Sequence, residues 1–191
     1  MKFEISNQHI WFAFWRRSNT TVKNVLISTD GACIGNPGPG GWACILRHGK
    51  RSREIYGSEP HTTNNRMELR AAIEGLRQLR EPCEVTVYTD SDYLKSGITE
   101  WLPKWKLNGW RKSKGSSGSR TVLNQDLWKE LDMLAQRHQV QWEWVRGHAK
   151  HEDNIRCDFL ANKAAREQIA SGASTDETPG ANKSEWRVSA R

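Results

Sequence analysis

The sequence predicts a single α/β domain built on a mixed sheet. Its first half contains three strand-like segments joined by short, glycine-containing connections, a pattern typical of an antiparallel meander. Segments with a helical period then alternate with further strand-like segments, and a helical connection between two strands favours parallel pairing. The element order βββαβααβα therefore indicates a sheet that combines antiparallel and parallel pairs.

The chain is expected to hold one domain with an additional segment at each end. Its 191 residues are enough for this arrangement. We expect an N-terminal extension at residues 1–22, the domain at 23–168 and a disordered tail at 169–191, because the tail is small, polar and contains glycine and proline. The stretch "IWFAFW" in the extension can be read as a partner-binding patch or as upstream sequence that packs loosely.

The first three strands follow from runs and alternations of apolar residues. "NVLIST" predicts a short buried strand that ends at Asp30, and "GWACILRH" and "REIYG" predict the next two strands. The glycines in "GACIGNPGPGG" are followed neither by the Lys-Ser or Lys-Thr of a phosphate-binding loop nor by a helix. They predict a hairpin, whose lack of side chains would let a large ligand approach the backbone.

The second half of the domain alternates helices and strands. A helix begins at Asn64, and the strand "EVTVYT" follows it and ends at Asp90. The helix has one apolar face, formed by Leu69, Ile73, Leu76 and Leu79. The remaining expected elements are a short helix at 91–98, a helix marked by Leu127, Leu131 and Leu134, a strand "QVQWEWV" with Val140, Trp142 and Trp144 on one face, and a last helix at 153–169.

Composition narrows the class of protein. The net charge is +7 and the pI is about 9.4, a balance typical of proteins that bind a polyanion. The four cysteines form no C-x-x-C pair, which argues against a metal finger and favours free thiols. No apolar run approaches the roughly 18 residues that cross a bilayer, and "HIWFAFWRR" carries its charges after its apolar run, unlike a signal peptide. We therefore expect a cytoplasmic protein without a membrane partner.

Four acidic residues occupy positions that folding would bring together. Asp30 and Asp90 end two strands that are expected to pair in parallel, so they would lie side by side at one edge of the sheet. Glu68 lies one turn into the first long helix, and Asp158 lies early in the last helix. Such a cluster is costly unless cations occupy it, and hard oxygen ligands favour Mg²⁺ or Mn²⁺ over zinc. Two such ions about 4 Å apart can activate a water and stabilise the leaving oxygen of a phosphodiester.

Each of these residues also has a purely structural interpretation. Taken singly, Asp30 could cap a turn, and Asp90 could be the N-cap of the short helix. Glu68 or Asp158 could be a solvated helix charge. His148, in the loop "RGHAKHEDN", could be an ordinary surface histidine. Only their combination indicates a catalytic centre.

Four blocks of the sequence resemble those of type 1 ribonuclease H, especially its bacterial form. They follow the order of that family over roughly Asn24 to Arg166, and they read "TDGACIGNPGPGGWACILR", "TTNNRMELRAAIEGL", "TDSDYLKSGITEWL" and "WEWVRGHAKHEDNIRCDFLA". The resemblance implies a ribonuclease-H-like fold, with a five-stranded mixed sheet flanked by helices. It also implies an endonuclease that hydrolyses the RNA strand of RNA/DNA hybrids by two-metal-ion catalysis, leaving 5′-phosphate and 3′-hydroxyl ends.

The resemblance assigns roles to individual residues. Asp30, Glu68, Asp90 and Asp158 fall on the family's metal-binding acids. His148 falls on its mobile-loop histidine, which is thought to assist proton movement and product departure. Because all five are present, we expect an active enzyme that uses Mg²⁺, with Mn²⁺ as an alternative, and acts as a monomer on an RNA/DNA hybrid duplex.

The asparagines beside the expected acids resemble the family's groove contacts. Asn36, Asn64 and Asn65 match positions in the minor groove, where 2′-hydroxyls distinguish RNA from DNA. Thr63 matches a phosphate contact on the DNA strand. The alternatives are turn formation and helix capping, and both are open to Asn64.

A basic stretch between Trp101 and Arg120 resembles the protrusion that grips the DNA strand in this family. It contains six basic residues and no acidic ones. Phosphate contacts from it would make the affinity sensitive to salt. The expected contacts are Trp101, Lys104, Lys106, Arg111, Lys112 and Lys114. The stretch can also be read as packed tryptophans with solvated lysines, and both readings can hold together.

Three features depart from the family pattern. Asp92 stands where Gln is common. It adds a negative charge beside the metal centre, which could weaken an RNA contact or shift the metal affinity. Lys150 replaces a frequent glycine and is expected to stiffen the histidine loop, and "KGSSGSRT" makes the protrusion longer and more flexible.

Two other functions remain open from the sequence. A nuclease of integrase or resolvase type would have the same fold and cleave DNA. A binding module without catalysis would have lost one of the acids. The block "TTNNRME" favours the hybrid as substrate, and the full set of acids favours catalysis.

Overall fold

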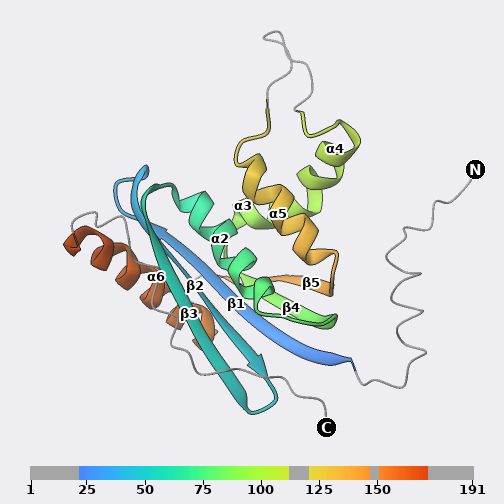
Figure 1. The fold of residues 1–191 in the computed structure, drawn as a ribbon, viewed down its shortest axis with the longest axis horizontal. Coiled ribbons are helices and arrows are strands. Elements are labelled where there is room, and N and C mark those ends of the chain that lie inside the picture. The colour runs from blue at the N-terminus through green and yellow to red at the C-terminus, as the bar shows by residue number, and fades with distance from the viewer. Residues whose placement is uncertain (1–21, 112–120, 147–150, 172–191) are drawn as a thin grey trace, which may run out of the picture.

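A five-stranded mixed sheet forms the centre of the computed structural model, which describes residues 22–111, 121–146 and 151–171 (Figure 1). The β1–β2 and β2–β3 pairs are antiparallel, and the β1–β4 and β4–β5 pairs are parallel. The predicted mixed sheet is thereby confirmed. In spatial order the strands are β3 (Arg51–Thr62), β2 (Gly38–His48), β1 (Lys23–Cys33), β4 (Cys83–Thr89) and β5 (Gln139–Trp144).

Helices flank both faces of the sheet. On one face, α2 (Asn64–Arg77) packs over β1 and β2 and against α5 (Gln125–Ala135), around the larger core to which β4 and β5 also contribute. On the opposite face, α6 (Glu152–Ala170) crosses over β1, β2 and β3 (Figure 1). The predicted apolar face of α2 is confirmed, because Leu69 and Ile73 are fully buried. The smaller core beneath α6 consists of Ala43, Ile45, Cys157, Leu160 and Ala161.

The segment between β4 and α5 is more complex than expected. The short helix predicted at 91–98 is α3 (Asp92–Ser96), and it is followed by a π-helical segment (Gly97–Trp101) and by α4 (Leu102–Leu107). The last two elements were not predicted. Each spans fewer than two helical turns, so neither leaves a readable apolar period in the sequence.

Two glycines let the helices pack directly on the sheet. A Cβ atom on Gly31 would lie 2.3 Å from the backbone nitrogen of Glu68, and one on Gly41 would lie 2.1 Å from the carbonyl oxygen of Ala161. The predicted hairpin between β1 and β2 is confirmed. The space at these two glycines, however, is taken by α2 and α6 rather than left for a ligand.

The limits of the domain stay predictions. Helix α6 ends at Ala170, one residue beyond the predicted end. Residues 1–21 and 172–191 lie outside the described residues, so the extension and the tail stay predictions. All four cysteines are free thiols, as expected, and none of the described helices is long and apolar enough to span a membrane.

Candidate active site

Three carboxylates from three separate elements meet at one end of the sheet. Asp30 comes from β1, Glu68 from α2, and Asp90 directly follows β4. One carboxylate oxygen of each residue lies within 4.8 Å of those of the other two. We call these three residues the acid centre.

The register of the parallel pair explains why Asp30 and Asp90 are neighbours. Ser28 on β1 pairs with Tyr88 on β4, and both acids come two residues later. The sequence prediction that these two acids lie side by side is therefore correct. The expected end of the first strand at Asp30 is wrong, because Asp30 pairs with Ala43 and β1 continues to Cys33.

The acid centre is buried and electrostatically unfavourable without a cation. Asp30 is 7% exposed and Glu68 is 5% exposed. Burial raises the pKa of Asp30 to about 8, and the charges of Asp90 and Asp158 add to the rise. Burial also raises the pKa of Glu68 well above its usual value, with further contributions from Asp30 and Asp90. These carboxyls resist ionisation because like charges face one another away from water.

The fourth expected acid, Asp158, lies at the side of the acid centre. It is not one of the three residues whose oxygens lie within 4.8 Å of one another, yet its charge contributes to the raised pKa of Asp30. It lies on α6, and its Oδ1 accepts a hydrogen bond of 2.8 Å from Nδ2 of Asn162. The folded chain thus brings all four predicted acids to one region.

The donor atoms of the acid centre fit a divalent cation. Oε2 of Glu68 is buried and has no hydrogen-bond partner among the described residues. Its other oxygen, Oε1, accepts a hydrogen bond of 3.4 Å from Nδ2 of Asn64. A buried oxygen without a partner is costly, and an ion with a preference for oxygen ligands removes that cost while neutralising the charges.

The asparagines predicted to contact substrate lie beside the acid centre. Oδ1 of the exposed Asn36 accepts a hydrogen bond of 3.1 Å from the backbone N–H of Asn64, which ties the β1–β2 hairpin to the start of α2. The N-cap of α2 is Thr63, so a capping role for Asn64 is wrong. Asn65 is half-buried in the first turn of the same helix.

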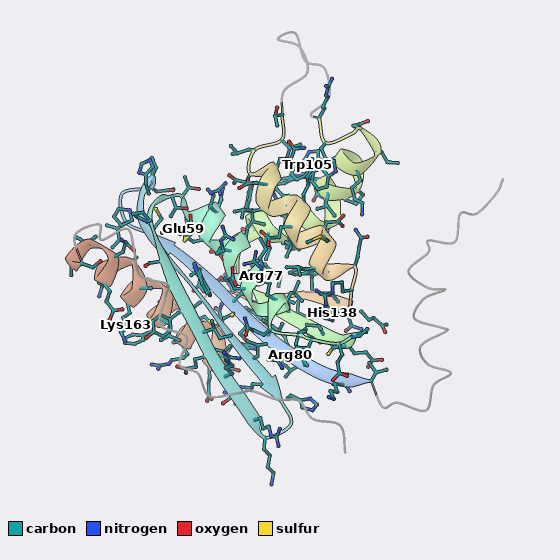
Figure 2. All side chains as sticks on the ribbon, viewed as in Figure 1. Glu59, Arg77, Arg80, Trp105, His138 and Lys163 are labelled. Atoms are coloured by element: carbon teal, nitrogen blue, oxygen red, sulfur yellow. The ribbon has the colours of Figure 1, made fainter. Side chains whose placement is uncertain are left out.

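A second feature is a cleft of about 320 Å³ between α3, the π-helical segment, α4 and the residues just before α5. We call it the aromatic cleft; it is lined by Tyr93, Trp101, Lys104, Trp105, Asn108, Arg111 and Leu123. The ring centroids of Trp101 and Trp105 are 5.7 Å apart, and the centroid of Trp105 is in turn 5.7 Å from that of Trp128 on α5. Figure 2 labels Trp105 in this part of the molecule. Three of the residues predicted to bind the DNA strand therefore line one aromatic, basic surface.

The remaining predicted substrate residues are placed differently or lie outside the described residues. Lys106 points to α5, where its Nζ is 2.9 Å from Oδ2 of Asp132. His148, Lys112, Lys114 and Lys150 lie outside the described residues. Asp92 is exposed in the first turn of α3, a position where a negative charge stabilises a helix.

Sequence reasoning missed several residues that build this region. Asn124 has a left-handed backbone (φ 56°) and donates a hydrogen bond of 3.2 Å to the hydroxyl of Tyr93. The same asparagine accepts a hydrogen bond of 3.4 Å from Arg66 of α2. These long-range contacts leave no local signal. Asn162, in contrast, lies one helical turn beyond Asp158, and that spacing could have indicated the contact.

The chain is similar to known proteins of one family. The family model described as RNase H matches residues 22–166. A ribonuclease H from Solibacter usitatus is 57% identical over 150 residues, which cover 78% of this chain and all of that protein. A ribonuclease H from Halorhodospira halophila is 58% identical over 142 residues, covering 74% of this chain and 93% of its own length.

Solved structures show the same fold. The crystal structure of LC9-RNase H1, a type 1 RNase H with the type 2 active-site motif, superimposes with a TM-score of 0.69 at 34% identity, covering 79% of this chain and 76% of its own. LC11-RNase H1, solved in complex with an RNA/DNA hybrid, shares the fold with a TM-score of 0.57 at 20% identity, over 76% of this chain and 99% of its own. From the family model and these relatives, the chain belongs to the ribonuclease H family.

Proposed function

We propose that Asp30, Glu68, Asp90 and Asp158 hold two Mg²⁺ ions with which the protein hydrolyses the RNA strand of RNA/DNA hybrids. Membership of a family of hybrid endonucleases supports the reaction. The observation that carries the metal assignment is the meeting of three carboxylates within 4.8 Å, two of them buried, with one orphaned oxygen. Mn²⁺, which also accepts oxygen ligands, is an alternative ion.

The chemistry divides between the ions and the chain. Two bound ions would activate the attacking water and stabilise the leaving 3′ oxygen, so the products carry 5′-phosphate and 3′-hydroxyl ends. The acids would hold the ions, and Asn64 and Asn162 orient two of the acids through their side-chain hydrogen bonds. His148 would move a proton and assist product departure, and this role stays a proposal because it lies outside the described residues.

The substrate would lie across both features of the molecule. Asn36, Asn64 and Asn65 flank the acid centre and present polar groups suited to 2′-hydroxyls in a shallow minor groove. The aromatic cleft offers Lys104 and Arg111 for phosphates of the DNA strand. Placing the two strands on different surfaces gives a physical reason for a preference for hybrids.

One chain is proposed to suffice, because all carboxylates of the acid centre come from the same molecule. The four free thiols support action in a reducing cytoplasm.

The test is a metal titration of cleavage on an end-labelled hybrid. Matched DNA and RNA duplexes of the same sequence serve as competing substrates, and Asp90→Asn serves as the inactive control. We expect cleavage of the RNA strand of the hybrid alone, with a dependence on Mg²⁺ or Mn²⁺. Comparable cleavage of the DNA duplex would indicate an integrase-type nuclease, and hybrid binding without cleavage in either metal would indicate a binding module.

A further inference from the structure

We propose that Trp144 is a positioning residue for the acid centre, because its indole N–H fixes the backbone of Asp90 and thereby the carboxylate that this backbone carries. Nε1 of Trp144 donates a hydrogen bond of 3.2 Å to the carbonyl oxygen of Asp90. The inference rests on the proposed role of Asp90 as a metal ligand.

Asp90 needs such support more than the other three acids do. Asp30 lies inside β1, where its backbone pairs with Ala43 of β2. Glu68 and Asp158 lie inside α2 and α6, where the helical hydrogen bonds fix the backbone. Asp90, in contrast, follows the last residue of β4 and precedes α3, so it belongs to neither element.

The indole contact lies just beyond the end of the parallel β4–β5 ladder. The last pair of the β4–β5 ladder joins Thr89 to Trp144. The backbone N–H of Val145 donates to the carbonyl of Thr89 at 2.9 Å, and the side chain of Trp144 then supplies the donor for the next carbonyl, that of Asp90. The carbonyls of Thr89 and Asp90 are therefore both held by residues at the end of β5 or just after it, one by a backbone donor and one by a side-chain donor.

The residue that follows Asp90 is held as well, so the turn is anchored on both sides. The backbone N–H of Ser91 donates to Oγ1 of Thr89 at 3.2 Å. The hydroxyl of Ser91 caps α3 by accepting a hydrogen bond from the N–H of Leu94. Of these anchors, the bond from Trp144 acts on the carbonyl of Asp90 itself.

Core packing does not explain an indole at this position. Trp144 is 41% exposed, whereas Trp142 on the same strand packs against the larger core. The exposed ring instead receives the ammonium of Lys95 from α3, with Nζ 4.7 Å from the ring centroid. This contact orients the ring between α3 and β5, so that its N–H faces Asp90.

The expected consequence is a change in metal affinity. Groups that orient metal ligands from outside the coordination sphere typically change affinity or activity about 10- to 100-fold when they are removed. Trp144→Phe keeps an aromatic ring for Lys95 and removes only the donor N–H. We expect it to weaken Mn²⁺ binding roughly tenfold, at the lower end of that range.

The experiment measures Mn²⁺ binding by calorimetry on the full chain without substrate, and then kcat and KM on a hybrid. Trp144→Phe should raise the dissociation constant of Mn²⁺ and the Mn²⁺ concentration needed for half-maximal kcat, and leave KM for the hybrid within about twofold. Trp142→Phe is the matched control: it should lower the melting temperature and keep the Mn²⁺ affinity. Benzothienylalanine at position 144 has the size of an indole but no N–H, so it removes the donor without the loss of volume that Phe brings. It should therefore weaken Mn²⁺ binding even if the smaller ring of Trp144→Phe unfolds the strand end.

Wild-type Mn²⁺ affinity and kcat in both Trp144 variants would overturn the inference. A change in KM alone would also overturn it, because it would make Trp144 a substrate contact. Asp90→Asn separates the two proposals. If Asp90→Asn binds Mn²⁺ like the wild type, the metal assignment itself fails and this inference fails with it. If only Asp90→Asn loses affinity, the metal assignment stands and the role of Trp144 is refuted.

Discussion

The acid centre and the aromatic cleft are built in opposite ways. The acid centre joins residues from β1, α2 and the end of β4, which are distant in sequence, and two of its three carboxylates are almost completely buried. The aromatic cleft comes almost entirely from one continuous stretch, residues 93–111, with Leu123 as the exception. It is formed by short helices and a π-helical segment, and two residues with positive φ, Gly109 and Trp110, lie between its lining residues Asn108 and Arg111.

The difference reflects what each region has to hold. Like charges can be kept together only by a scaffold whose own stability exceeds their repulsion, and strands and long helices supply it. Side chains that bind phosphates, in contrast, need to be long and exposed to the substrate. We therefore expect substitutions in the acid centre to change kcat, metal binding and pH-dependent stability, and substitutions in the aromatic cleft to change KM and its salt dependence.

The largest expected effect is the loss of a carboxylate from the acid centre. Asp90→Asn keeps the size of the side chain and removes its charge, so kcat should fall by more than the roughly hundredfold that loss of an outer group can cause. Single-turnover cleavage of a labelled hybrid measures this, with circular dichroism as the control for folding. Turnover close to that of the wild type would place the metal elsewhere.

The second expected effect concerns stability without metal. Burial raises the pKa of Asp30 to about 8 in the folded protein without metal, whereas its pKa in the unfolded chain is about 3.9. Between these values the folded state binds more protons, so the free energy of unfolding should decrease as the pH rises. Urea unfolding in EDTA at several pH values should show this decrease, and Mg²⁺ should reverse it at pH 8.

Asp30→Asn is the matched comparison for this measurement. Its stability in EDTA should depend less on pH between 4 and 8, and Mg²⁺ should stabilise it less. Burial lowers the pKa of His138 to about 4, so this residue contributes the opposite slope between about pH 4 and 6.5. Because His138 is present in both proteins, its contribution cancels in the difference, which reports Asp30 together with its effect on the pKa of Glu68. Equal slopes would contradict the unfavourable charge that burial imposes on the acid centre.

The same contrast explains how much the sequence could predict. The acid centre was predictable because two strand ends carried Asp30 and Asp90, and a parallel pairing places equivalent strand ends together. The continuation of β1 through Asp30 was not predictable, because the residue that pairs with Asp30 is Ala43 of β2, 13 residues away in the sequence. The indole contact of Trp144 was invisible for a similar reason: alternation places it on the apolar face, and only the end of β4 brings Asp90 within reach.

The aromatic cleft was predictable in composition but not in shape. The tryptophans and cations are visible in the sequence, whereas α4 and the π-helical segment are too short to leave a period. The direction of Lys106 was also hidden, because it depends on Asp132 of a helix that follows much later in the chain. The local sequence therefore predicts the positive charge of this surface, but it does not indicate which of the cations face the substrate.

The third prediction tests the aromatic cleft as a phosphate-binding surface. Lys104→Ala and Arg111→Ala should each raise KM for the hybrid while kcat stays near that of the wild type. Each lost phosphate contact should make the slope of log affinity against log salt less negative by about 0.9, the value for B-DNA. Binding titrations at several salt concentrations measure the slope. A fall in kcat with unchanged KM would instead connect these cations to the reacting phosphate.

The smallest expected effect distinguishes among the cations of the same stretch. Lys106 pairs with Asp132 on α5, and exposed pairs of this kind contribute about 0.2–1 kcal/mol to stability. Lys106→Ala should therefore lower the melting temperature slightly and change the salt dependence of hybrid binding less than Lys104→Ala does. If Lys106→Ala changes the salt slope as much as Lys104→Ala, the ion pair with Asp132 must open when the hybrid binds. The aromatic cleft would then be a surface that rearranges around its substrate, in contrast to the fixed geometry of the acid centre.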